Sequence, residues 1–299
     1  ATRNQQKTGQ TPLRRSARLA PKDQVATPAS STSRSQTCTI ADAARTLVQP
    51  YTPTRPPHIG LNTPQRHIKW HESRPTRQEV GQVAILGERC GTSGIDPDMG
   101  VVELSHLAGR ATPPGKRKRM EISFGAEKIN LDTRPNLVPL DSSLHASSDI
   151  GIWVWAPSIP VLQKLLRVLT TKTLPEWTGA RPPHRNAHGF IHYEDVFPFD
   201  GEGMDYQFIP SVDWCPYVHI PIATKNQDGE YKTEYYEYPS LDATESHLPP
   251  VTMHCSPYFV VWKAYWAITT KGHRLPAWAR QEEDLIIQIG EIMVGDHRI

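Results

Sequence analysis

Two histidines, an asparagine and an aspartate are gathered in the segment from Glu103 to Gly151. His106 ends an apolar run, His145 lies nine positions after Asn136, and Asp149 lies four positions after His145. An imidazole titrates near neutral pH, so it can take a proton from water or bind a divalent cation, while an amide can fix a loop through hydrogen bonds. Hydrolysis of a phosphodiester needs an activated water and a cation that offsets charge on the phosphate. The segment therefore predicts a compact metal-dependent phosphodiesterase site.

Two strands separated by a loop are predicted to carry the first half of this set. Residues 99–107, MGVVELSHL, are apolar and β-branched and predict a strand with His106 near its end. Residues 108–119 contain the run Pro113, Pro114 and Gly115 and predict a loop or a break. Residues 129–138 predict a second strand or extended segment.

A short helix is predicted to carry His145. The sequence LDSSLHAS, after Pro139, has the composition of a helix with Asp141 or Ser142 as its cap. A strand, a loop and a helix would together bring His106, Asn136 and His145 close in space.

The specific pattern extends beyond the histidines. It comprises the turn from Cys90 to Gly94, His106 with Arg110 four positions later, and then Asn136, Leu140, Leu144, His145, Asp149 and Gly151. Over roughly residues 82 to 156, this pattern resembles an HNH endonuclease domain of the ββα-metal type.

The resemblance implies a role for each matching polar residue. His106 would be the general base, Asn136 would hold the loop or assist the metal, and His145 would be the metal ligand on the helix. Asp149 resembles the acidic residue that follows the second histidine and would orient or supply a metal ligand, and Arg110 would contact phosphate. The implied activity is cleavage of DNA with a divalent metal, Mg²⁺ first, with Mn²⁺ or Zn²⁺ as alternatives.

The position before the predicted base departs from the family. Many HNH enzymes carry Asp or His there as a metal ligand, whereas this chain has Ser105. A hydroxyl is a poor ligand beside a carboxylate or an imidazole. Two alternatives follow. Another carboxylate, Asp141 or Asp149, replaces the missing metal ligand, or the chain is a catalytically degenerate HNH-fold protein with a nucleic-acid-binding or regulatory role.

A run of four basic residues separates the two halves of the predicted site. Lys116, Arg117, Lys118 and Arg119 would draw the phosphates of DNA or RNA toward the site, with binding that weakens as salt rises. A solvated loop or a nuclear import signal accounts for the run equally well.

The first 80 residues differ in composition from the rest. They hold 13 Lys and Arg against 4 Asp and Glu, are rich in Pro, Ser and Thr, and contain few apolar clusters. Such a segment cannot bury enough apolar surface to offset its ordering entropy, so it is predicted to be a disordered basic tail. Its basic cluster, Arg14, Arg15, Arg18 and Lys22, suits phosphates or an import receptor, and an ordinary solvated tail also accounts for it.

The whole chain is predicted to be an intracellular α+β protein of the nucleus or cytoplasm. Its four cysteines form no CxxC pair, which favours a reducing compartment, and its longest apolar run, residues 256–268, is too short to span a bilayer. We therefore expect a tail at 1–80, an HNH nuclease-like domain at 81–157 and an α+β extension of unknown role at 158–299. The expected partner is nucleic acid, DNA first, and no membrane.

The extension contains several recognisable elements. Helices are predicted at 161–171, 258–270 and 278–293, with short strands at YQFIP and YVHIPI and a hairpin around Asn226 to Gly229. The tryptophans lie in apolar segments and are expected to pack in the core rather than to stack on bases. His184, His188 and His192 recur every four positions, but prolines and a glycine among them argue against a helix that would align them on a metal.

Overall fold

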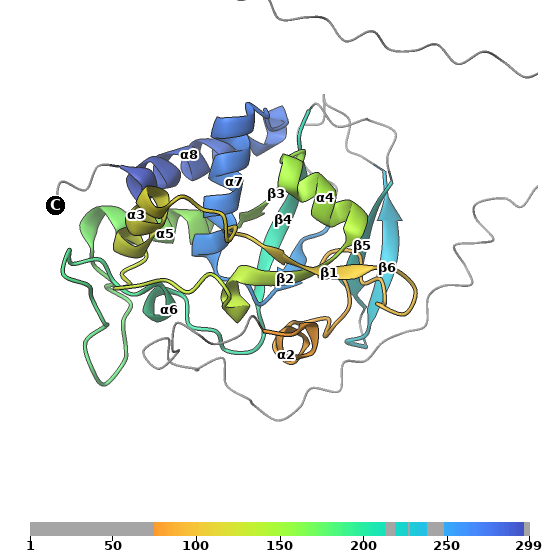
Figure 1. Cartoon of the computed structure of the whole chain (residues 1–299), viewed down its shortest axis with the longest axis horizontal. Coiled ribbons are helices and arrows are strands. Elements are labelled where there is room, and N and C mark those ends of the chain that lie inside the picture. The colour runs from red at the N-terminus through yellow and green to blue at the C-terminus, as the bar shows by residue number, and fades with distance from the viewer. Residues whose placement is uncertain (1–74, 213–218, 227, 238–247, 296–299) are drawn as a thin grey trace, which may run out of the picture. The chain divides into compact units, whose positions relative to one another are not determined.

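The computed structural model describes residues 75–212, 219–226, 228–237 and 248–295. Most of the predicted tail, with its basic cluster, lies outside these residues. Within them the chain forms an α+β fold of small antiparallel sheets and helices, as predicted (Figure 1). The described part begins with α2 (Arg77–Gly81), whose capping box joins Thr76 and Glu79.

An antiparallel strand pair followed directly by a helix carries most of the predicted site residues. Strand β1 (Val102–His106) pairs with β2 (Leu137–Asp141), from Val102 opposite Asp141 to His106 opposite Leu137. Helix α4 (Ser142–Ile150) follows β2 without a connecting loop because Asp141 is its N-cap and accepts hydrogen bonds from the backbone of Ser143 and Leu144. The predicted first strand and the predicted helix with its aspartate cap are both confirmed.

The second strand was predicted too early in the chain. Residues 129–133 form an irregular loop, η2 (Arg134–Asn136) is a turn of 3-10 helix, and pairing starts only at Leu137. Pro135 cannot donate to a strand ladder, which favours the turn over an extended strand at this point.

The prediction of a loop over 108–119 is also wrong in its second half. Helix α3 (Pro114–Ser123) begins at Pro114 and includes all four residues of the basic run. Proline is well tolerated at the first helical position because its missing N–H would have no partner there and its φ angle already suits the helix. The basic side chains therefore project from a helix.

The remaining sheets come from the second half of the chain. Strands β3 (Trp153–Pro157), β4 (Met204–Pro210) and β7 (Val251–Met253) form one antiparallel sheet. Strands β5 (Ile220–Lys225) and β6 (Tyr231–Tyr236) form the predicted hairpin, whose turn is held by hydrogen bonds to Asn226.

The three predicted long helices are present. They are α5 (Ile159–Thr171), α7 (Pro257–Lys271) and α8 (Arg280–Val294), with the shorter α6 (Tyr193–Val196) and η3 (Ala277–Ala279). Helix α7 packs on β3 and on α8, while α8 also contacts α3 and α5 (Figure 1). No helix of the described residues combines the length and apolar character needed to cross a bilayer.

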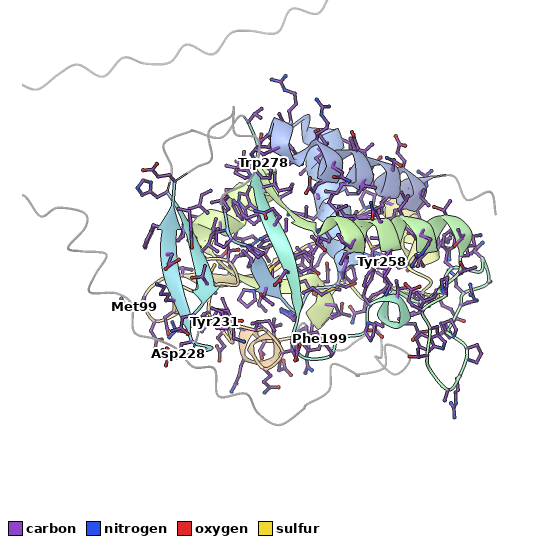
Figure 2. All side chains as sticks on the ribbon, turned by 180° about the vertical axis from the view of Figure 1, so that it is seen from behind. Met99, Phe199, Asp228, Tyr231, Tyr258 and Trp278 are labelled. Carbon is purple, nitrogen blue, oxygen red and sulfur yellow. The ribbon has the colours of Figure 1, made fainter. Side chains whose placement is uncertain are left out.

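One hydrophobic core joins residues on both sides of position 157. Its buried side chains run from Cys90 to Met293, and large aromatic residues such as Tyr258 fill the interior (Figure 2). Trp153, Trp155 and Trp262 are at most 3% exposed and pack in this core, as predicted, whereas Trp266, for which the same was predicted, is only partly buried against it. Helix α7 thus shares one core with β1, β2 and α4.

Candidate active site

Asn136 ties the two segments that flank the basic helix. Its side chain is fully buried, accepts a hydrogen bond from the backbone N–H of Ala108 at 2.7 Å, and donates to the carbonyl oxygens of Ala108 and Leu131 at 3.0 and 2.7 Å. The amide therefore fixes the chain just after β1 against the loop that precedes β2. This is the geometry of a residue that holds a loop, one of the two roles that the resemblance implies for it.

His106, the last residue of β1, is bound to a carboxylate from that same loop. Its Nε2 lies 2.9 Å from Oδ1 of Asp132, and the two side chains are 12% and 16% exposed. Asp132 also accepts two hydrogen bonds from Arg110, at 3.1 and 2.7 Å, through Oδ2. A carboxylate partner orients an imidazole and stabilises its protonated form, which suits a proton acceptor.

The charge of Asp132 is favoured by these contacts. Partial burial raises the pKa of its carboxyl, but the hydrogen bonds from His106 and Arg110 outweigh burial and bring the pKa below its ordinary value of 3.8. Asp132 is therefore ionised at neutral pH beside the predicted base.

His145 has a carboxylate at each ring nitrogen. Its Nδ1 lies 2.7 Å from Oε2 of Glu103 on β1, and its Nε2 lies 3.5 Å from Oδ2 of Asp149, one helical turn later on α4. A carboxylate at Nδ1 favours the tautomer with the proton on that nitrogen, which leaves the Nε2 lone pair for a cation. This is the usual arrangement of a metal-binding histidine held by an outer carboxylate.

A cavity of about 350 Å³ brings His106 and His145 to the same space. Its walls come from the end of β1 and the following loop, the start of α3, helix α4 and helix α7. The lining residues with polar or aromatic side chains are His106, Thr112, Lys116, His145, Asp149, Trp262, Lys263 and Trp266. The site is therefore shared between the predicted nuclease-like segment and the extension.

Helix α7 supplies side chains that the sequence did not single out for the site. Lys263 Nζ lies 2.9 Å from Oδ1 of Asp149, and Lys116 Nζ lies 3.4 Å from the ring centroid of Trp266. Lys263 is the charged residue within the apolar run 256–268, and this was a sign in the sequence that this face of α7 has a polar neighbour.

The other predicted phosphate-binding residues make contacts of their own. Arg110 binds Asp132, Arg117 donates to the Arg110 carbonyl at 3.5 Å, Lys118 lies 3.8 Å from Glu121, and Arg119 donates to the Val294 carbonyl at 2.7 Å. Of the basic run, Lys116 is the member whose side chain lines the cavity.

Ser105 does not face the site. It is 1% exposed and pairs with Val138 on β2. Asp141 is one of the two carboxylates that could replace the metal ligand missing at position 105. It already caps α4 and accepts hydrogen bonds from Ser93 Oγ and Cys90 Sγ. Asp149, the other candidate, lines the cavity.

The side chains at the cavity that could bind a cation suit Mg²⁺ or Mn²⁺ better than a structural zinc ion. No group of three or more His, Cys, Asp or Glu side chains in the described part of the chain has the arrangement of a metal site. A structural zinc site needs four protein ligands, whereas Mg²⁺ is often held by one or two protein ligands with water and substrate phosphate. Asp149 would supply the carboxylate oxygen that Mg²⁺ or Mn²⁺ prefers and His145 Nε2 a second ligand, whereas two ligands are too few for a structural zinc site.

The histidines of the extension lie elsewhere. His184 and His192 approach each other, with ring centroids 5.7 Å apart, in a segment that is not helical. His254 is buried and its Nε2 contacts the carbonyl of Arg134 at 3.1 Å, and burial is the main reason that its pKa falls to about 4. These rings serve packing and backbone contacts.

Comparison of the chain with protein-family models, with curated proteins and with solved structures finds no match. The functional argument therefore depends on the geometry of the cavity and on the chemistry of the side chains that line it.

Proposed function

We propose that this chain is a metal-dependent endonuclease of the HNH type that hydrolyses phosphodiester bonds in DNA. The observation that carries the proposal is that His106 and His145, from β1 and α4, line one cavity while each is bound to its own carboxylate. Two antiparallel strands followed directly by a helix, with α3 inserted between the strands and Asn136 joining the segments that flank α3, are the core elements that a ββα-metal domain would have.

His106 is the general base in this proposal. It takes a proton from a water molecule whose oxygen attacks the scissile phosphorus, and Asp132 stabilises the imidazolium that results. Asn136 acts indirectly, because it holds Leu131 and Ala108 and so positions both Asp132 and the end of β1.

His145 and Asp149 would hold the divalent cation, with Glu103 orienting the imidazole. The bound cation would offset charge on the scissile phosphate and on the leaving oxygen. Lys116 and Lys263 add positive charge at the cavity wall and would attract the DNA backbone.

Cleavage of DNA in Mg²⁺ or Mn²⁺, both as supercoiled plasmid and as a single strand, tests this proposal. We expect His106→Ala to be slower by about 10²- to 10⁴-fold, the usual contribution of a general base. We also expect His145→Ala to lose activity and to need a higher metal concentration for any cleavage that remains. The matched control is His219→Ala, since His219 is exposed at the start of β5 and does not line the cavity. Equal rates for wild type and His106→Ala would refute the proposal.

A second candidate is a non-catalytic nucleic-acid-binding protein on the same scaffold. Two observations favour it. Ser105 is buried and offers no ligand to a metal, and the ammonium of Lys263 already neutralises the carboxylate of Asp149. Calorimetric titration with Mn²⁺ separates the candidates. Specific binding heat in wild type that His145→Ala abolishes supports the nuclease, and no specific heat in either protein supports the alternative.

A further inference from the structure

One wall of the cavity is aromatic and basic. Trp262, Lys263 and Trp266 lie within about one turn of α7 and line the cavity that contains His106 and His145. Trp262 is 2% exposed and belongs to the core, whereas Trp266 is only partly buried. The two indole rings meet edge to face with centroids 5.8 Å apart. Trp266 is therefore the indole of this pair with surface to offer a ligand.

Lys116 covers the ring of Trp266. Its ammonium lies 3.4 Å from the ring centroid, and both side chains line the cavity. Such a contact is weak at a solvent-accessible site, and a phosphate is a stronger partner for an ammonium than an indole face is. A phosphate that enters the cavity would draw Lys116 off the ring and uncover the indole for a base.

The size of the cavity limits what can occupy it. About 350 Å³ is near the lower end of the roughly 300–1,000 Å³ range of small-ligand pockets, which suits one nucleotide unit. A base inside a duplex is stacked on both faces and cannot present one of them to an indole, whereas an unpaired base can.

We infer that the cavity binds an unpaired nucleotide and that the preferred substrate is single-stranded DNA. The base stacks on Trp266 and an adjacent phosphate is held by Lys116 and Lys263. This inference rests on the proposed function, because it names the substrate form for the same site. It also gives the extension a role, since Trp266, on which the base stacks, belongs to α7.

Binding in EDTA, where the metal-dependent reaction does not run, tests the inference. Fluorescence polarisation would compare a short labelled oligo(dT) with a labelled duplex of equal length. We expect the single strand to bind about tenfold or more tightly, and Trp266→Ala to weaken its binding by about tenfold, as for loss of one stacked base. Trp266→Phe should keep most of the affinity, and Lys116→Ala should weaken binding and reduce its salt dependence.

The matched controls are Lys232→Ala and Tyr235→Ala, an exposed cation and an exposed aromatic residue on β6, away from α3 in Figure 1. Both should bind oligo(dT) like wild type. Lys116→Ala removes a partly exposed side chain from the first turn of α3, so it tests the inference even if Trp266→Ala fails to fold.

The outcomes distinguish this inference from the nuclease proposal. Equal binding of duplex and single strand, or unchanged oligo(dT) binding by both Trp266→Ala and Lys116→Ala, overturns the inference and leaves the nuclease proposal standing. Selective binding of oligo(dT) that depends on Trp266 and Lys116, without cleavage in Mg²⁺ or Mn²⁺, supports the binding site and refutes the nuclease.

Discussion

At the scale of single residues, the ionisation of the Asp132 carboxyl affects the stability of the folded state. It is held by His106 and Arg110, and its pKa lies below the ordinary value of 3.8. A carboxyl whose pKa is depressed by folding stabilises the folded state fully above its unfolded pKa, and that contribution is lost as the pH falls through the folded pKa.

The first prediction concerns Asp132→Asn. At neutral pH we expect a melting temperature lower by about 2–4 °C, since one charge-assisted contact contributes about 1 kcal/mol in a chain of this size. The difference should shrink as the pH falls through 3.8 and below, because the carboxyl is then protonated first in the unfolded chain and, at still lower pH, in the folded one. Melting curves at several pH values check this, and a difference that is the same at pH 7 and pH 3 would contradict it.

The second prediction concerns Asn136→Ala. The substitution leaves the Ala108 N–H and the carbonyls of Ala108 and Leu131 without their partner in a buried site. We expect a loss of about 3 kcal/mol or more in the free energy of unfolding, because each buried unsatisfied group costs about 1–3 kcal/mol. Urea denaturation measures it. An unchanged midpoint would show that Asn136 does not hold the loop.

At this scale, the sequence could not reveal that Asp132 binds His106 and that Glu103 binds His145. His106 and Asp132 are 26 positions apart, and Glu103 and His145 are 42 apart. Residue types and spacing singled out the histidines and Asn136, but the pairing of each ring with an acid is a tertiary contact. Asp132 lies four positions before Asn136, so the loop that Asn136 holds was the place to look for it.

At the scale of elements, α4 owes its position to its first residues. Asp141 ends β2 and caps α4 through one side chain, and it also accepts hydrogen bonds from Ser93 and Cys90. Because strand and helix meet at this residue, the direction of α4 and the placement of His145 follow from it. The local signals of cap and composition were sufficient to predict this helix.

The third prediction concerns this cap. Asp141→Ala should lower the free energy of unfolding by about 1–2 kcal/mol, the usual cost of losing an N-cap, and more if Ser93 and Cys90 are left unpaired. Asp141→Asn, which keeps a capping oxygen, should lose less. Urea titration of both variants checks the order, and equal stability of Asp141→Ala and wild type would contradict it.

Helix α3 shows where element prediction failed. Two prolines and a glycine indicated a loop, yet Pro114 stands at the first helical position, where proline is favourable. The helix is stabilised by tertiary contact, since its buried last turn packs toward α8 and Arg119 binds the carbonyl of Val294. Such a contact, 175 positions away, leaves no local signal.

At the scale of the whole molecule, the second half of the chain takes part in the site. Lys263 on α7 binds Asp149 on α4 across 114 positions, and the buried core runs through both halves. An ammonium beside a carboxylate competes with a divalent cation for the same oxygen atoms.

The fourth prediction follows from that competition. Lys263→Met keeps the apolar stem and removes the charge, so it should increase the affinity for Mn²⁺ by several-fold, corresponding to about 1 kcal/mol for a partly exposed ion pair. Calorimetric titration measures this without reference to cleavage. Unchanged or weaker Mn²⁺ binding would show that Asp149 is not a ligand.

The central claim is that His106 activates water at a cavity shared with His145. Its most direct test is the rate of Mg²⁺- or Mn²⁺-dependent cleavage of one DNA substrate by wild type and by His106→Ala at equal concentration. The predicted result is cleavage by wild type and a rate about 10²- to 10⁴-fold lower for the variant, whose melting temperature should stay within about 2–4 °C of the wild-type value. Cleavage at the same rate by both proteins, or by neither, would contradict it.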